Sequence, residues 1–341
     1  MKPEFQLTFL NKIQRLFAEG DFTASYKYAL LIAIADIAVE SGRDDDQPLT
    51  IPHRRLGEKF IELYWQQAAP FKGDGVLIQN NASQAAVISQ IAQFRNKHQA
   101  TTVTTARSLI GYKHLLRSVT NTVVAYPVNH IQNLGGKKGK LEQFLFHIDA
   151  ESITLLPGVA YCLRRFQPLV QQLARSHWID HIKRNKQNIA LLGQDNDLES
   201  FLFETSRQSL VIVQTSLRKI SNKCFYCGSS VTDADVDHFI PHSLYPRDLA
   251  HNFVLAHPSC NRSKSDTLAA KAHLHRWLEF VQSNADKLSE IGYDAGIMAD
   301  EGSMDSVARW GYANAVAGGA QGWIKSAQYE LIDATYLNAW A

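Results

Sequence analysis

Two short pairs of metal-ligating residues constrain this chain more than any other feature of its sequence. Cys224 and Cys227 form a Cys-x-x-Cys pair, and His257 and Cys260 form a His-x-x-Cys pair about 30 residues later. Four such ligands in two closely spaced pairs are what a closed tetrahedral Zn2+ site requires. A closed site leaves no position for water, so we expect this zinc to be structural and to fasten loops together.

The use of cysteine indicates a reducing compartment. Three of the four cysteines fall within one stretch of 37 residues, as metal ligands would, and Cys162 is expected to be a buried core thiol. The N-terminus lacks the features of a secretory signal, and the longest apolar stretch, residues 29–39, is too short to cross a bilayer. We therefore expect a cytoplasmic protein with no membrane partner.

Positive charge is unevenly distributed along the chain, although the net charge is only +2. Residues 101–141 contain no Asp or Glu, and the only acidic residue in 161–187 is Asp180. The basic residues of these stretches are Arg107, Lys113, Arg117, Lys137, Lys138, Lys140, Arg164, Arg165, Arg175, Lys183, Arg184 and Lys186. Lys and Arg neutralise phosphates, so this region is a candidate DNA-contacting lobe, and a solvated basic surface is the alternative.

The stretch QNLGGKKGK, residues 132–140, looks at first like a phosphate-binding loop. It fails the P-loop pattern, because Gly135 stands too close to Gly139 and Leu141 replaces the required Ser or Thr. Two hypotheses remain for it: a basic hairpin tip that touches nucleic-acid backbone, or a flexible turn.

Between the two zinc pairs stands a second set of residues. Its members are Asp237, His238, Pro241, Asn252, Asn261 and Lys264. From VDHFIP through NFVLAHPSCNRSK, roughly residues 220–270, the sequence resembles the HNH family of ββα-metal (His-Me finger) nucleases, in the subtype with a zinc knuckle. It is also similar to the HNH domain of the RNA-guided CRISPR nuclease, which shares Asp-Val-Asp-His, then Asn, then Asn-Arg-x-Lys-Ser-Asp. Many family members have cysteine where this chain has His257, but imidazole serves zinc equally well.

Each residue of this set has a task in phosphodiester hydrolysis. His238, with an ordinary pKa near 6.5, can take a proton from the attacking water. Asp237 and Asn261 offer hard oxygen ligands to a catalytic Mg2+ or Mn2+. The resemblance implies that Asn252 orients the base imidazole. Lys264 is expected one helical turn beyond Asn261, facing the phosphate.

The resemblance implies a local fold with a geometric conflict in it. We expect strands at residues 236–240 and 253–255 and a helix from Pro258 or Ser259 onward. Neighbouring side chains on a regular strand point to opposite faces, so Asp237 and His238 could not both face one metal. The conflict eases if the metal sits at a strand edge or the chain bends before Pro241.

The whole chain is predicted to be an α+β protein, with mostly helical accessory regions around a central ββα-metal HNH module that has a structural zinc. The expected parts are a helical domain (1–100), a basic mixed α/β region (101–190), the HNH domain (210–275) and a helical C-terminal region (276–341). Within them we expect strands at residues 121–131, 142–148 and 152–158 and helices at 159–186 and 323–340.

The leading hypothesis is a metal-dependent DNA endonuclease that nicks DNA or cuts both strands. The alternatives are a catalytically inactive, zinc-containing DNA-binding or regulatory module, and an RNA-directed nuclease. The overall architecture resembles HNH effectors of bacterial anti-phage (Zorya-type) or restriction systems, which implies a role in defence and possible protein partners from the same system.

Overall fold

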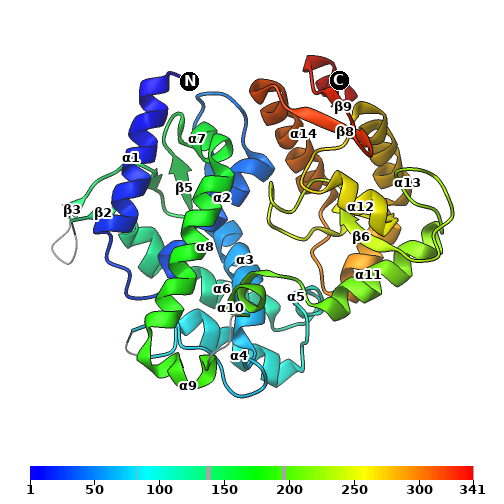
Figure 1. The fold of residues 1–341 in the computed structure, drawn as a ribbon. Helices are drawn as coiled ribbons and strands as arrows, with labels where there is room; N and C mark the ends of the chain where they lie inside the picture. The colour runs from blue at the N-terminus through cyan, green and yellow to red at the C-terminus, as the bar shows by residue number, and fades with distance from the viewer. Residues whose placement is uncertain (82, 136–139, 194–196, 341) are drawn as a thin grey trace. The chain divides into compact units, whose positions relative to one another are not determined.

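The computed structural model describes residues 1–81, 83–135, 140–193 and 197–340, which form two compact units, Met1–Glu204 and Thr205–Ala341 (Figure 1). The four-part division expected from the sequence is finer than this partition and stays a prediction. The protein is of mixed helix and strand, with helices predominating. In the described residues no helix is both long and apolar enough to cross a membrane.

The first unit is mostly helical. Its helices are α1 (Pro3–Glu19), α2 (Tyr26–Ser41), α3 (His53–Tyr64), α4 (Ala86–His98), α5 (Val103–Arg107), α6 (Tyr112–Val123), α7 (Val159–Arg165), α8 (Gln167–Arg184), α9 (Ile189–Leu192) and α10 (Leu198–Phe203), with short turns η1 (Gln66–Ala68), η2 (Val124–Val128) and η4 (Lys186–Asn188). Its strands are β1 (Thr50–Pro52), β2 (Asn133–Leu134), β3 (Lys140–Leu141), β4 (Phe146–Ile148) and β5 (Ser152–Leu155). They form an antiparallel sheet in the order β1-β5-β4 and a separate β2-β3 pair.

Helix α2 is the core of the first unit. Its residues from Tyr26 to Glu40 are all buried, and it packs against α8, α7 and α3. The two acidic residues on α2 are both satisfied: Gln171 donates a hydrogen bond to Asp36 at 2.6 Å, and Lys59 donates to Glu40 at 2.5 Å. A buried carboxylate must be paired in this way, because burial removes its hydration. The apolar stretch at residues 29–39 is thus a buried helix, as expected.

Residues 121–131 are not a strand as predicted. They continue α6 and pass into η2, a π-helical turn that contains Pro127. Most of the β-branched residues that suggested a strand instead lie on the buried side of this helical segment, where Val123, Val128 and Ile131 are fully buried. Tertiary packing overrides β propensity here.

Other predictions for the first unit are confirmed or corrected in detail. Strands β4 and β5 lie within the expected stretches, and the helix predicted at 159–186 is divided at Phe166 into α7 and α8. The tip of the expected basic hairpin, residues 136–139, lies outside the described residues; β2 and β3 pair on either side of it.

Part of the expected basic surface is neutralised internally. Arg107 donates to Glu62 at 2.6 Å, and the buried Arg164 donates to Asp44 at 2.7 Å. These two guanidinium groups hold the fold together and are not free for phosphate.

The second unit contains the predicted ββα segment. Its helices are α11 (Arg207–Ile220), α12 (Pro258–Lys264), α13 (Lys271–Ala295) and α14 (Glu301–Gly318), with turns η5 (Ala250–Asn252) and η6 (Ala334–Trp340), and its strands are β6 (Asp235–His238), β7 (Phe253–Ala256), β8 (Gln321–Lys325) and β9 (Gln328–Leu331). Strands β6 and β7 pair antiparallel, so that Asp235 lies opposite Ala256 and His238 opposite Phe253. The module lies toward the C-terminal end of the chain and not in its middle.

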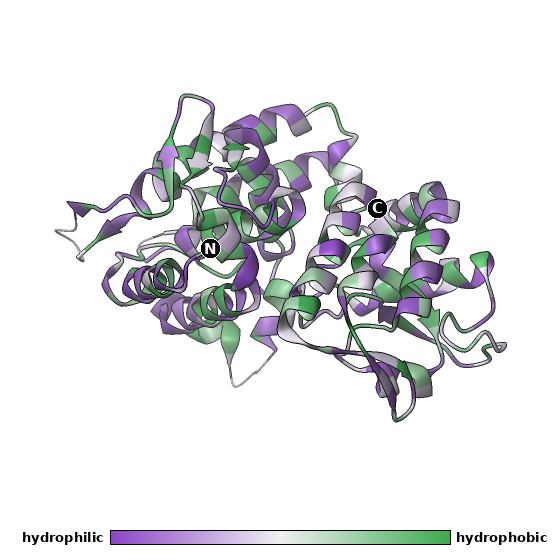
Figure 2. Ribbon diagram, turned by 90° about the horizontal axis from the view of Figure 1, so that it is seen from above, coloured by the Kyte–Doolittle hydropathy of each residue, from purple (hydrophilic) through white to green (hydrophobic). Residues whose placement is uncertain are grey.

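The helix predicted at 323–340 is wrong. Strands β8 and β9 form an antiparallel hairpin there, followed by the 3-10 turn η6. Trp323 on β8 is buried, and its indole Nε1 donates to Ser263 of α12 at 3.1 Å. An aromatic stack joins α13 to the loop that follows β6: the rings of Phe239 and Trp277 lie parallel, with centroids 4.7 Å apart. Both units carry helices with hydrophilic and hydrophobic residues mixed along them (Figure 2), and α3, α6 and α11 are amphipathic, whereas α2 is buried on all sides.

Replacing Glu40 with Ala should destabilise the first unit. The change leaves the buried Lys59 ammonium without its carboxylate and removes the 2.9 Å contact from Arg55. We expect a loss of about 3–5 kcal/mol in the free energy of unfolding, measured by chemical denaturation. The exposed pair Arg54–Glu58 is the matched control, and Arg54→Ala should cost less than about 1 kcal/mol. Equal effects of the two changes would contradict the importance of the buried pair.

Candidate functional site

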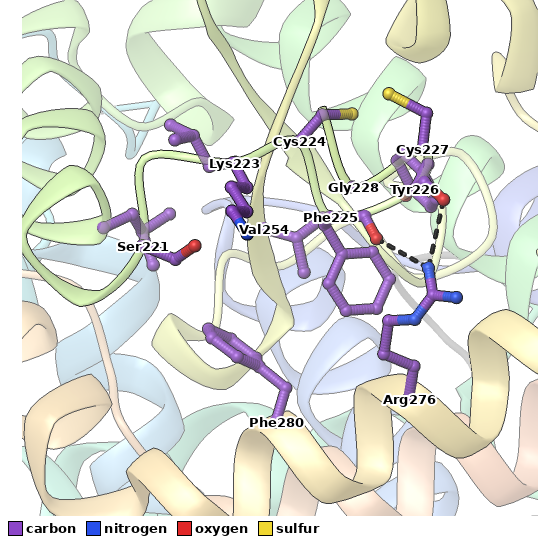
Figure 3. Close-up of a pocket in the computed structure, with 12 residues that line it drawn as sticks. Ser221, Lys223, Cys224, Phe225, Tyr226, Cys227, Gly228, Val254, Arg276 and Phe280 are labelled. Carbon is purple, nitrogen blue, oxygen red and sulfur yellow. Dashed lines mark hydrogen bonds between the residues drawn. The ribbon is translucent and has the colours of Figure 1, made fainter. Parts of the chain in front are cut away.

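The four predicted zinc ligands come together at one point. Cys224 and Cys227 lie in the turn after α11, His257 directly precedes α12, and Cys260 is in its first turn. One ligand atom from each residue lies within 4.8 Å of all the others. The sulfur atoms of Cys224 and Cys227 point toward one another (Figure 3). This cluster of three thiols and one imidazole suits tetrahedral zinc.

The backbone of this zinc knuckle, residues 224–228, is held by its neighbours. Gly228 has a φ of 76°, a left-handed conformation that glycine adopts without strain, and its amide donates to the Cys224 carbonyl at 2.9 Å. Arg276 on α13 donates from Nη1 to the carbonyl oxygens of Phe225 and Tyr226, at 2.9 and 3.0 Å (Figure 3). The knuckle is therefore anchored to α13 as well as to α12.

The histidine ligand is oriented by a backbone carbonyl. His257 Nε2 lies 3.1 Å from the Ser230 carbonyl oxygen, so this nitrogen carries the proton and donates it. Nδ1 then holds the lone pair, and it lies 3.3 Å from the Cys227 sulfur, inside the ligand cluster. A metal-ligating histidine commonly has such an outer hydrogen bond, which fixes its tautomer.

The thiols of the cluster differ in acidity. Burial and the neighbouring Cys224 and Cys227 raise the pKa of Cys260 to about 12. For Cys227, burial opposes ionisation, but hydrogen bonds from the backbone and side chain of Ser229 and from Cys224 outweigh it and lower its pKa to about 7. Zinc binds thiolates, so zinc binding to the cluster must release protons from the thiols. The Cys260 thiol, which has the highest pKa, is the one most affected.

A buried contact joins the knuckle to the predicted catalytic residues. Tyr226 lies between the two cysteine ligands, and its hydroxyl donates to Asp237 Oδ2. Lys264 on α12 also contacts this carboxylate, with its Nζ 3.2 Å from Oδ2, and it donates to the His238 carbonyl at 2.9 Å. Sequence reasoning missed Tyr226, although its place between the cysteines is visible in the motif.

Lys264 does not face the phosphate as expected. Its side chain is fully buried, with 0% exposed, against Asp237 and the backbone of β6. Burial lowers the pKa of Lys264, which the Asp237 carboxylate partly offsets. The prediction that Lys264 contacts substrate is therefore corrected: the residue ties α12 to β6.

The side chain of His238 is held by a residue that the sequence did not indicate. Its Nε2 lies 2.5 Å from Asp248 Oδ1. Burial alone would raise the pKa of Asp248, but the hydrogen bond and charge of His238, together with a hydrogen bond from Thr205, lower it. Asp248 stands ten residues after His238 in the loop before η5, and only tertiary folding brings the two together.

The two predicted asparagines occupy different places. Asn252 clamps the backbone of Ile240, accepting from its amide at 2.8 Å and donating to its carbonyl at 2.9 Å. Among the described residues the hydrogen bond to the His238 imidazole comes from Asp248, and the expected role of Asn252 in orienting the base stays a prediction. Asn261 on α12 donates to Asp235 at 3.0 Å.

The alternation of strand β6 divides the predicted site. Asp235 and Asp237 lie on the face that contacts α12, through Asn261 and Lys264. His238 points away from that face toward Asp248 and packs on Phe253, with ring centroids 4.9 Å apart. The structure thus pairs Asp237 with Lys264 and Asp235 with Asn261, and it places the His238 side chain on the other face of the strand.

The Asp237 carboxylate, expected to hold a catalytic Mg2+ or Mn2+, already has protein partners. Both Asp237 oxygens lie near the Lys264 ammonium, and Oδ2 also accepts from Tyr226. Oδ1 has the fewer partners of the two oxygens, with the Lys264 ammonium at 3.4 Å, and is the more available to a metal. The magnesium assignment to Asp237 and Asn261 stays a prediction.

A cavity of about 280 Å3 borders the zinc knuckle, lined by residues of the knuckle, α11, β7 and α13 (Figure 3). Its walls are largely apolar side chains, including Leu217, Val254 and Phe280, and neither His238 nor Asp237 lines it. This cavity lies beside the zinc knuckle, away from the residues predicted to be catalytic.

A ββα segment with a zinc cluster and an Asp-His at the end of its first strand defines the HNH class. The HNH endonuclease family model matches residues 224–267, so the second unit carries an HNH endonuclease domain, which points to a nuclease that acts on nucleic acid. A second model, described as a domain of unknown function (DUF8808), matches residues 6–198. This match covers more than half of the sequence, and the chain belongs to that family. No curated protein and no solved structure matches the chain significantly.

Removing one zinc ligand should release the metal. We expect Cys260→Ser to abolish stoichiometric zinc, measured by mass spectrometry of the purified protein, and to lower its melting temperature, because α12 loses its anchor to the knuckle. Cys162→Ser is the matched control, since Cys162 is buried outside the cluster and its change should leave the zinc content intact. Full zinc retention in Cys260→Ser would show that Cys260 is not a ligand.

Removing the Tyr226 hydroxyl tests the contact between the knuckle and Asp237. Tyr226→Phe leaves the buried carboxylate with one donor fewer, and we expect a loss of about 1–3 kcal/mol in the free energy of unfolding with unchanged zinc content. Tyr329→Phe, at an exposed position of β9, should change it by less than about 0.5 kcal/mol. Zinc loss in Tyr226→Phe would mean instead that the hydroxyl is needed to form the metal site.

Proposed function

We propose that this protein is a metal-dependent endonuclease that hydrolyses phosphodiester bonds of DNA, with His238 as the general base. The observation that carries the proposal is the paired imidazole at the end of β6, inside a domain of the HNH family. The HNH match supports cleavage of nucleic acid in general, and DNA as the substrate is the finer part of the proposal.

The position of His238 suits a base. Its side chain is 23% exposed, so a water molecule can reach it, while the ring packs against Phe253 and is bonded to Asp248. A carboxylate only accepts hydrogen bonds, so Nε2 carries the proton and Nδ1 has a free lone pair. A neutral imidazole in this state can take the proton of an attacking water at neutral pH.

The remaining site residues have supporting roles in the proposal. Asp237 and Asn261 would hold Mg2+ or Mn2+, which supplies charge stabilisation on the scissile phosphate and the leaving oxygen. Asn252 fixes the loop after β6 through Ile240, and Lys264 fixes the Asp237 carboxylate. The structural zinc holds α12, which carries both Asn261 and Lys264, against the knuckle.

One observation favours a second candidate function. Asp237 already has a buried ammonium and a tyrosine hydroxyl as partners, an arrangement that is satisfied without any catalytic metal. A zinc-containing module that binds DNA without cutting it, and serves a regulatory role, would have the same structure.

The biological role is proposed from architecture alone. A single HNH domain behind a largely helical region is the arrangement expected of bacterial restriction or anti-phage effectors, which act with protein partners of the same system. One HNH centre cuts one strand at a time, so nicking is the expected first product.

Plasmid cleavage tests the proposal. With Mg2+ or Mn2+ the wild type should convert supercoiled plasmid to nicked circles, and His238→Ala should slow this about 10²–10⁴-fold, because proton transfer loses its base. His275→Ala, at an exposed position on α13, is the matched control and should cleave normally. Parallel reactions with single-stranded RNA test the RNA-directed alternative.

Two outcomes would contradict the proposal in different ways. If plasmid stays intact with every metal tried but still binds with the same affinity to wild type and His238→Ala, the binding module is the better description. If His238→Ala nicks as fast as the wild type, His238 is not the base.

A further inference from the structure

We propose that Asp248 is a positioning residue for His238: its carboxylate holds the proton on Nε2 and thereby keeps the lone pair of Nδ1 ready to accept the water proton. This inference rests on the proposed function and deepens it. Asp248 lies outside the residues that the HNH resemblance indicated.

The contact between the two side chains is short and sheltered. His238 Nε2 and Asp248 Oδ1 are 2.5 Å apart, and the Asp248 side chain is only 11% exposed. A charge-assisted hydrogen bond at this distance, with little competing water, strongly favours one tautomer of the imidazole. The hydrogen bond also restricts rotation of the imidazole about the Cα–Cβ and Cβ–Cγ bonds of His238.

Asp248 is itself fixed on both sides. Immediately after it, Leu249 bridges to Met298, and the Ala250 amide donates to the Met298 carbonyl at 2.9 Å. At the other end of the loop, the Asn252 side chain is hydrogen-bonded to the backbone amide and carbonyl of Ile240. The Phe239 amide donates to the Asn252 carbonyl at 2.8 Å. These bonds keep the loop between β6 and β7 in one conformation. Asn252 therefore acts on the imidazole indirectly, through the loop that presents Asp248.

The carboxylate supports the chemistry at both stages. In the resting state it selects the tautomer. In the reaction the water proton moves to Nδ1, the water oxygen forms the new bond to phosphorus, the bond to the leaving oxygen breaks, and that oxygen takes a proton from solvent. The imidazolium then lies against an anionic partner that stabilises its charge, while Asp248 itself stays ionised.

The first test needs no variant. In wild-type protein labelled with ¹⁵N-histidine, we expect the His238 resonances to show a protonated Nε2 and an unprotonated Nδ1 at a pH above its titration, assigned by their loss in His238→Ala. In Asp248→Asn the tautomers should become mixed. A wild-type spectrum with the proton on Nδ1 would overturn the inference, whether or not the protein cuts DNA.

The second test is kinetic. Under single-turnover conditions we expect Asp248→Asn to slow cleavage about 10²–10⁴-fold, with DNA affinity unchanged within about twofold, because only the base is impaired. Asp233→Asn, an exposed acid of the same unit, should cleave like the wild type. In the His238→Ala background Asp248→Asn should cause no further loss, since Asp248 acts only through the imidazole.

The outcomes separate this inference from the proposed function. Normal cleavage by Asp248→Asn, or a further loss in the His238→Ala background, would overturn the role of Asp248 and leave the nuclease assignment standing. A wild type that cuts no DNA would overturn the nuclease assignment, and the NMR tautomer would still decide whether Asp248 sets the state of His238.

Discussion

The buried contact of Tyr226, Asp237 and Lys264 is the constraint on which the rest of the site depends. Tyr226 comes from the zinc knuckle, Asp237 from β6 and Lys264 from α12, so the contact joins the three elements of the HNH module. A carboxylate and an ammonium buried together are costly unless each has partners, and here each one satisfies the other. The expected zinc ligands and the residues predicted to be catalytic are therefore in contact: the knuckle reaches Asp237 through the Tyr226 hydroxyl.

Strand β6 places the side chains of Asp237 and His238, which are neighbours in the sequence, on opposite faces. Its α12-facing side carries Asp235 and Asp237, which bind the helix, and its other side carries His238, which Asp248 orients. Pleating alone enforces this division, because successive side chains point to opposite faces. In the proposed nuclease one face of this strand would serve assembly and metal binding, and the other would carry the base. The conflict noted for Asp237 and His238 in the sequence is real in the structure.

Prediction from the sequence succeeded where spacing along the chain carries the information. The zinc ligands form two close pairs, and the strand, strand and helix of the module follow the expected order and nearly the expected bounds. Prediction from the sequence failed where contacts between residues far apart in the chain determine the secondary structure or the partner of a side chain. Residues 121–131 became helix because their β-branched side chains fill a core, and residues 323–331 became a hairpin because Trp323 packs on Ser263 of α12. Lys264 was assigned to the phosphate, since a sequence does not show which face of a short helix is buried.

The sequence by itself determined the zinc cluster, the HNH module and the candidate base, because each depends on residue types at fixed short spacings. Only the tertiary structure decided the partners of these residues. Asp248 reaches His238 through a loop closed by Asn252 and Met298, and Tyr226 of the knuckle reaches Asp237 on β6 across the folded module. Such partners lie ten or more residues apart, where no periodicity links them.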